Sequence, residues 1–195
     1  MFESKYDATV NYVKEHTNDF DESHDYEHAK NVYNFAKQIM DSCKIEYDLD
    51  ILMFAALLHD VRDKKYANSI TLQQLEDYIS SFVPHQTTII IKIIENISYS
   101  REVSGKREKL EYPYNIYLDA ISDADRIEAL GKRGIHRCEI FTKTKGGKVP
   151  EDVIVHCHEK LLRLYPEQYI RTEMGRILAK PLHQEIVDYV EFNKT

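Results

Sequence analysis

A histidine followed directly by an aspartate, His59-Asp60, is the feature of this sequence with the clearest chemical potential. The pair follows residues 51–58, which are all apolar. A helix that is apolar on every side is buried. Burying a charge is costly unless the charge is paired or bound to a metal. The polar end of this helix therefore needs partners, and a divalent cation is the leading candidate.

Further side chains of the same kind lie at a distance along the chain. His28 precedes the pair, and Asp123 and Asp125 follow it in the segment ISDADR. Histidine and aspartate suit ions such as Mn, Fe, Co, Ni or Zn, and the wide spacing suits ligands from three helices of one bundle. Asp123 and Asp125 point about 200° apart on a helix, so one ion does not take both directly. Helical periodicity leaves open which of the two is a ligand.

Each of these residues also has an ordinary structural explanation. A single buried histidine is more often a satisfied core residue than a ligand. Asp60 can bond a neighbouring helix end, and Asp125-Arg126 can form a surface ion pair of little energetic weight. The combination, on a helix expected to be buried, favours the metal site.

The spacing of apolar residues predicts a helical protein. The first proline is Pro84 and the first glycine is Gly105, and so long a stretch without either favours helices joined by polar turns. The isoleucines of 84–98 also suit a strand, but their spacing is helical. The predicted helices span 3–17, 26–42, 48–63, 70–81, 84–98, 115–131, 150–165 and 167–193.

The helix predicted at 26–42 places His28 beside its apolar face. Ser23 or Asp25 is the expected N-cap. Gly131 and Gly134 indicate a C-cap turn after the helix at 115–131. The apolar stripe of 26–42 comprises Ala29, Val32, Tyr33, Ala36 and Met40.

Two charged segments, 99–114 and 142–149, are long enough to be lids or binding loops. Helical patterns with apolar faces resume on both sides of each, so neither is expected to be a linker. We therefore predict one all-α domain over residues 1–195.

The composition excludes several classes of protein. The net charge of −7 argues against nucleic acid or an anionic membrane surface as the main partner. No apolar run approaches the roughly 20 residues that span a membrane, and the first residues lack the apolar core of a signal peptide. The three cysteines are scattered, so we expect a reduced, cytoplasmic protein.

The order of these motifs resembles the H…HD…D signature of the HD-domain metal-dependent phosphohydrolases. SHDYEHAKNV, AALLHDVRDKK, SDADRIEALGKRGIHR and CHEKLLRL resemble, in that order, motifs of small bacterial and fungal HD hydrolases that include nucleotide pyrophosphohydrolases. The resemblance runs from about residue 23 to 164. It departs at Asn31, where the family usually has arginine, and at Glu128, where it usually has aspartate.

The resemblance implies an all-α HD-domain helical bundle with one divalent metal ion (Mn, Co, Ni, Fe, Zn or Mg). It implies metal ligands at four positions, and it selects Asp125 where periodicity did not. The implied activity is hydrolysis of a phosphoester or phosphoanhydride in a small molecule, most simply a nucleotide, by a pyrophosphohydrolase or a nucleotidase acting as a monomer or homodimer. The implied ligands are His28, His59, Asp60 and Asp125.

Two alternatives belong to other functional classes. One is a non-hydrolytic module that keeps a metal or nucleotide for signalling. The other is an HD-type di-iron oxygenase, which needs further ligands near the pair, with His85 as one candidate.

Other residues are assigned roles by their position. Asp60 can ligate the ion and orient water, and Asp63 shares a face with His59 if the helix persists and can accept a proton. His24, Asp25 and Asp63 are candidates for fixing the imidazoles. His156 is expected in a pocket or the core and His158 at the surface. The cations predicted to bind substrate phosphate are Lys64, Arg126, Arg137 and Lys160.

Overall fold

The computed structural model describes residues 4–21, 24–165 and 169–194, and within these ranges all regular structure is helical. This confirms the predicted fold class. The chain divides into two compact units, residues 1–122 and 123–195, with the boundary inside helix α7. The prediction of a single domain stays a prediction, and each unit is described by itself.

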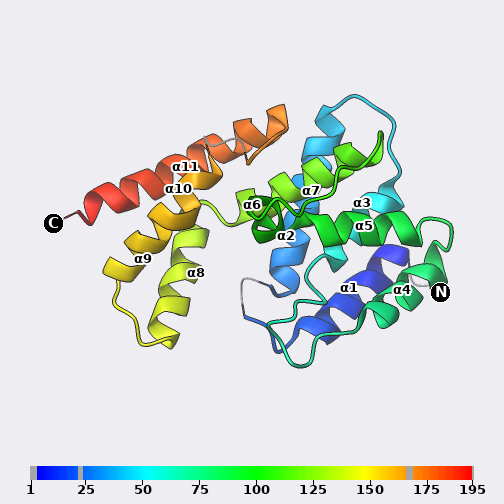
Figure 1. The fold of residues 1–195 in the computed structure, drawn as a ribbon, viewed down its shortest axis with the longest axis horizontal. Helices are drawn as coiled ribbons and strands as arrows, with labels where there is room; N and C mark the ends of the chain where they lie inside the picture. The colour runs from blue at the N-terminus through cyan, green and yellow to red at the C-terminus, as the bar shows by residue number, and fades with distance from the viewer. Residues whose placement is uncertain (1–3, 22–23, 166–168, 195) are drawn as a thin grey trace. The chain divides into compact units, whose positions relative to one another are not determined.

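The first unit contains α1 to α6 and the start of α7 (Figure 1). Helix α3 packs against α1, α2 and α5, and α4 packs against α5. The helices of this unit are α1 Lys5–Thr17, α2 Tyr26–Ser42, α3 Leu49–Leu58, α4 Leu72–Phe82, α5 Thr87–Ile97, α6 Tyr99–Val103 and α7 Tyr114–Glu128.

Helix α3 forms the centre of the first core. The Asp48 side chain accepts hydrogen bonds from the backbone N–H groups of Asp50 and Ile51 and so caps the helix. All residues from Ile51 to Leu58 are buried, as their composition predicts. Helix α5 confirms the helical interpretation of the isoleucine-rich segment, because its spacing buries Ile90, Ile93 and Ile97 on one face.

The segment after α5 is fastened to the first unit. Arg107 bonds Asp119 at 2.6 Å and Glu102 at 2.8 Å, and the backbone N–H of Glu108 donates to Asn96 at 2.8 Å. Part of this segment is helical in α6, where the sequence pattern predicted a loop. Its ion pairs hold it in place.

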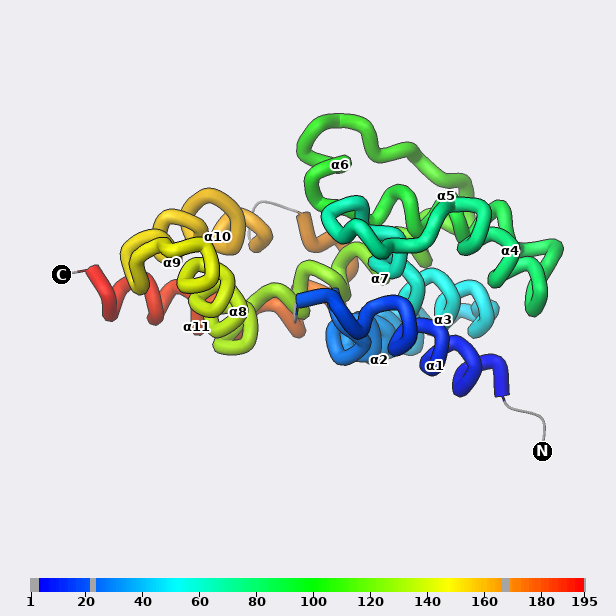
Figure 2. Tube along the Cα trace, turned by 90° about the horizontal axis from the view of Figure 1, so that it is seen from below, coloured from blue at the N-terminus to red at the C-terminus, as the bar shows by residue number. Residues whose placement is uncertain are grey.

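The second unit contains the rest of α7 and four further helices. Helix α8 packs against α9 and α11 (Figures 1 and 2). The single helix predicted at 150–165 is interrupted by a π-helical turn. The elements are α8 Gly131–Thr144, α9 Glu151–His156, the π-turn η1 Cys157–Leu161, α10 Leu162–Leu164 and α11 Glu173–Phe192.

The junction between α7 and α8 agrees with one prediction and corrects another. Helix α7 ends at Glu128, as the predicted glycine turn implies, and Gly131 has a φ of +71°. Helix α8 was not predicted, because two glycines near its start weaken the intrinsic helix preference. Packing against α11 outweighs that preference. Gly134 is required by space, since a Cβ there would lie 1.9 Å from the Ala129 carbonyl oxygen.

Candidate metal centre

Helix α2 brings His28 to the interior in its first turn. The Asp25 side chain accepts a 2.8 Å hydrogen bond from the His28 backbone N–H and starts the helix, which confirms Asp25 as the N-cap; Ser23 lies outside the described residues. His28 is 3% exposed. Because α2 packs against α3, the buried imidazole faces the end of α3.

Helix α3 ends at Leu58, and His59 follows as its C-cap. The His59 Nδ1 lies 2.9 Å from the Ala56 carbonyl oxygen, one turn back. A carbonyl oxygen accepts only, so Nδ1 carries a proton and Nε2 is the ring nitrogen that can offer a lone pair to an ion. A hydrogen bond of this kind fixes the tautomer and ring orientation of metal-binding histidines.

Three lone-pair atoms meet at the end of α3. His28 Nε2 lies 3.2 Å from His59 Nε2 and 3.3 Å from Asp60 Oδ2, and His59 Nε2 lies 3.2 Å from the same oxygen. Ligands about 2.1 Å from one ion lie about 3.0 Å apart at right angles and about 3.4 Å apart in a tetrahedron. The triangle has the dimensions of three ligands on one ion, and we call it the metal triangle.

The Asp60 carboxylate is the open corner of the metal triangle. Its side chain is 24% exposed, against 4% for His28 and 3% for His59. Burial raises the pKa of the Asp60 carboxyl, but the positive charge of protonated His59 and hydrogen bonds from both imidazoles hold that pKa well below its usual range. The carboxylate is therefore ionised at neutral pH, in the form that binds a cation.

The two aspartates of the DAD segment have different settings. The Asp123 carboxylate is fully buried and accepts hydrogen bonds from the backbone N–H groups of Arg171 and Thr172, and from the Thr172 hydroxyl at 2.7 Å. These contacts give Asp123 a structural role at the start of α11. Asp125 is in the second unit, and its assignment as the fourth ligand stays a prediction.

A second cluster lies next to the metal triangle in the first unit. The helix predicted to run to residue 63 ends at Leu58, so the condition for Asp63 to share a helix face with His59 is not met. Instead a turn places the Asp63 N–H 3.0 Å from the Asp60 carbonyl oxygen. The Asp63 carboxylate lies 3.4 Å from His24 Nε2 and 3.3 Å from Lys65 Nζ.

This arrangement bears on the residues predicted to fix the imidazoles. The His59 ring is held by the carbonyl of Ala56, which the sequence gave no reason to select. Asp25 bonds the backbone of His28. His24 and Asp63 contact each other, and both contact Lys65. The catalytic role predicted for Asp63 stays a prediction.

The predicted phosphate-binding cations are spread over both units. Lys64 is exposed in the first unit, whereas Arg126, Arg137 and Lys160 belong to the second. Arg126 is buried and donates to the Tyr169 carbonyl. Arg137 forms a buried ion pair with Glu128. These contacts give both arginines structural partners, and substrate binding by the four cations stays a prediction.

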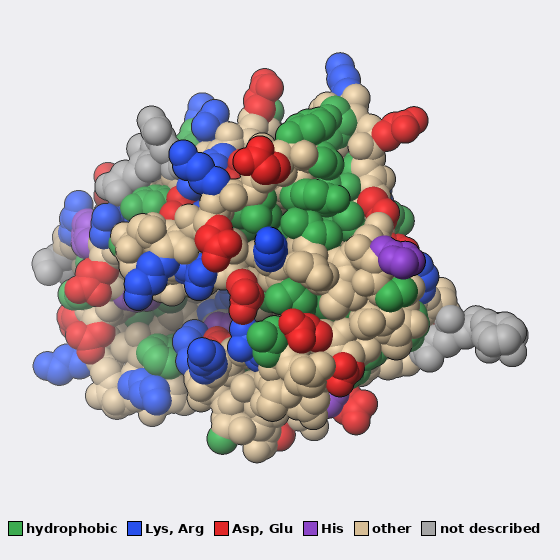
Figure 3. Space-filling view, turned by 45° about the vertical axis from the view of Figure 1, so that its right-hand side comes forward, with side chains coloured by type: hydrophobic (Ala, Val, Ile, Leu, Met, Phe, Trp, Pro, Cys, Tyr) green, Lys and Arg blue, Asp and Glu red, His purple; other side chains and the backbone are tan. Residues whose placement is uncertain are grey.

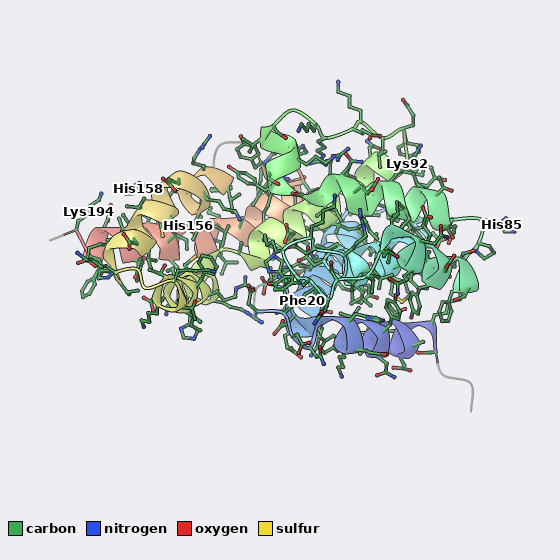
Figure 4. All side chains as sticks on the ribbon, turned by 60° about the horizontal axis from the view of Figure 1, so that its bottom comes forward. Phe20, His85, Lys92, His156, His158 and Lys194 are labelled. Carbon is green, nitrogen blue, oxygen red and sulfur yellow. The ribbon has the colours of Figure 1, made fainter. Side chains whose placement is uncertain are left out.

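Three other histidines were considered as ligands or pocket residues. His85 is exposed in the turn between α4 and α5 and points away from the first unit (Figure 4). His158 is exposed, as predicted, whereas His156 is half-buried, and its place in a pocket or the core stays a prediction. Burial and the nearby Lys160 charge lower the pKa of His156. Within the described ranges, the candidate metal-binding group consists of His28, His59 and Asp60.

The surface is consistent with the composition. Charged side chains of both signs are interspersed over the face shown in Figure 3. None of the described helices is long and apolar enough to cross a membrane.

The fold is shared with a solved HD-superfamily hydrolase. The structure superimposes on an HD-superfamily hydrolase from Bacillus thuringiensis with a TM-score of 0.73 at 24% identity, covering 96% of this chain and 94% of that one. It superimposes on Bacillus subtilis YpgQ in complex with ADP with a TM-score of 0.75 at 25% identity, covering 96% and 95%.

In sequence, the chain is 31% identical to the uncharacterized protein YpgQ of Bacillus subtilis over 186 residues, which is 92% of this chain and 87% of YpgQ. The chain therefore belongs to the family of YpgQ. No protein-family model matches the chain.

Proposed function

We propose that this protein is a metal-dependent phosphohydrolase that acts on a nucleotide. The observation that carries the proposal is the metal triangle, whose three corners are 3.2 to 3.3 Å apart and whose carboxylate corner is open to solvent. The ADP complex of YpgQ supports a nucleotide as the substrate. Triphosphate pyrophosphohydrolase and nucleotidase activity both fit this chemistry.

The residues of the metal triangle have different proposed roles. With an ion bound, His28 and His59 would present unprotonated Nε2 atoms, and with Asp60 and the predicted ligand Asp125 they would hold the ion. When bound, a divalent ion lowers the pKa of a coordinated water molecule and polarises a phosphoryl oxygen. The second Asp60 oxygen is available to accept a hydrogen bond from the attacking water and to aim it at phosphorus. Asp63 is the predicted proton acceptor beyond it.

A product-release screen tests the proposal. Protein supplemented with Mn, Co or Mg is incubated with nucleoside mono-, di- and triphosphates, and phosphate and pyrophosphate are measured, with Asp60→Ala as the control. Pyrophosphate release from triphosphates that is lost in the control establishes a pyrophosphohydrolase, and phosphate release from monophosphates establishes a nucleotidase. Tight metal binding with no turnover on any nucleotide contradicts the proposal and favours the non-hydrolytic binding module.

A further inference from the structure

Three polar atoms form a second triangle beside the first. Lys65 Nζ lies 3.2 Å from His24 Nε2 and 3.3 Å from Asp63 Oδ2, and His24 Nε2 lies 3.4 Å from the same carboxylate oxygen. We call this group the lysine triangle. An ammonium group has three N–H donors, and two of them have partners in this triangle.

The partners of the lysine are held in place. His24 Nδ1 lies 3.1 Å from the Asp21 carboxylate and 3.2 Å from the Tyr66 hydroxyl. The Tyr66 ring stacks on Phe20 at a centroid distance of 3.8 Å. The His24 and Asp63 side chains are only 18% and 19% exposed, whereas the Lys65 side chain is 67% exposed. The two partners that hold the Lys65 ammonium group are therefore themselves held in place, and the lysine side chain is accessible to a ligand.

The lysine triangle is tied to the metal triangle at two points. The Asp63 backbone N–H donates to the Asp60 carbonyl. The His24 and His28 rings have centroids 6.2 Å apart, so the imidazoles of His24 and His28 lie between the lysine and the predicted ion. A substrate phosphate on the ion would have its neighbouring phosphate close to this cation.

We propose that Lys65, positioned by Asp63 and His24, binds the phosphate next to the one that is hydrolysed. The inference rests on the proposed function and narrows its substrates to nucleotides with two or more phosphates. A carboxylate partner does not prevent this role, because protein kinases use a lysine paired with a glutamate to hold ATP phosphates. Asp63 is then a positioning residue for Lys65.

Equilibrium binding of ADP and AMP to the Mn-loaded protein tests the inference without requiring turnover. The wild type should bind ADP at least about tenfold more tightly than AMP. Lys65→Met should weaken ADP binding about 10- to 100-fold, the value of a lost hydrogen bond to a charged group. AMP binding should change less than about threefold, because AMP has no second phosphate for Lys65 to hold.

Three variants make the test specific. Lys92→Met removes an exposed lysine from α5 and should leave both affinities unchanged (Figure 4). Lys64→Met should weaken ADP binding less than Lys65→Met does. Asp63→Asn should weaken ADP binding selectively while the bound Mn stays at the wild-type level.

The inference is overturned if Lys65→Met weakens ADP and AMP equally, if Lys64→Met has the larger effect, or if the wild type does not prefer ADP. Those results leave the proposed hydrolysis standing when the release screen is positive. A negative screen combined with an ADP preference lost in Lys65→Met removes the proposed hydrolysis and retains the phosphate site.

Discussion

The metal triangle and the lysine triangle have similar dimensions but differ in where their positive charge comes from. Each contains a histidine from the start of α2 or the residues before it, and an aspartate from the turn after α3. Their third corners differ: one has His59 and the other has Lys65. The lysine supplies a positive charge inside its own cluster, whereas the metal triangle contains a carboxylate and two imidazoles and takes its positive charge from an ion.

This difference suits the two triangles to different proposed roles, metal binding and phosphate binding, within one short segment. Neutral imidazole is a ligand for divalent metals, while an ammonium cannot ligate and instead attracts phosphate as a point charge. The turn from His59 to Tyr66 would therefore place the proposed metal-binding corner and the proposed phosphate-binding corner next to each other. The buried Glu128–Arg137 pair of the second unit gives a third case, in which both charges are internal.

The largest effect should come from removing a corner of the metal triangle. His59→Ala should lower metal affinity and nucleotide hydrolysis by at least about 10³-fold, since even outer partners of metal ligands cost 10- to 100-fold. Helicity by circular dichroism should be retained. His158→Ala, which changes an exposed histidine, is the control, and hydrolysis at the wild-type rate in His59→Ala contradicts the assignment.

Breaking the buried ion pair between Glu128 and Arg137 should lower the stability of the fold rather than metal binding. Arg137→Ala leaves the Glu128 carboxylate buried without its main counter-charge, and such a change costs about 3–5 kcal/mol. Arg133, 3.3 Å from the other Glu128 oxygen, has a side chain that is 50% exposed, so Arg133→Ala should cost less than about 1 kcal/mol. Urea unfolding compares the two variants, and a loss below about 1 kcal/mol in Arg137→Ala would contradict a structural role for Arg137.

Metal binding should raise the free energy of unfolding through the metal triangle and not through the lysine triangle. At a free Mn concentration 100 times its Kd, binding adds about 2.7 kcal/mol, which raises Tm by about 5–10 °C for a chain of this size. Lys65→Met should keep the shift and His59→Ala should lose it. Differential scanning calorimetry before and after chelation measures the metal-dependent rise in Tm of both variants. A rise in Tm that is lost in Lys65→Met would show that Lys65 belongs to the metal site.

The smallest effect should be the acid dependence of the metal-free protein. The pKa of Asp60 is lowered in the folded state, so its contribution to stability is complete above the ordinary carboxyl pKa and is lost as pH falls through the lowered value. Asp60→Asn should remove this part of the acid sensitivity, and Asp19→Asn, at an exposed position, should not. Urea midpoints at pH 7 and pH 3 compare the variants.

Much of the metal triangle could be predicted because its signals are local. The all-apolar composition of α3 predicts its burial, and burial explains why His59 and Asp60 need partners. The stripe on α2 places His28 beside the core. Asp125 required the family resemblance, because two aspartates on one helix are equally compatible with periodicity.

The lysine triangle could be predicted only in part. A pair of Asp63 with Lys64 or Lys65 follows from their positions along the chain, whereas the contact of Lys65 with His24 is made only by the folded turn. Among Lys64 and Lys65, sequence position favours neither, and the resemblance drew attention to Lys64. Helix α8 was missed for a related reason, since its stability comes from packing on α11 and not from its glycine-containing start. Arg137 likewise looks like a phosphate ligand until its contact with Glu128 is seen.

The most direct test of the account compares two carboxylates three residues apart. Bound Mn per chain is measured by elemental analysis after equilibrium dialysis of the wild type, Asp60→Asn and Asp63→Asn. The account predicts one ion in the wild type and in Asp63→Asn, and almost none in Asp60→Asn. One ion retained in Asp60→Asn, or an ion lost in Asp63→Asn, would contradict the assignment of the metal triangle as the metal centre.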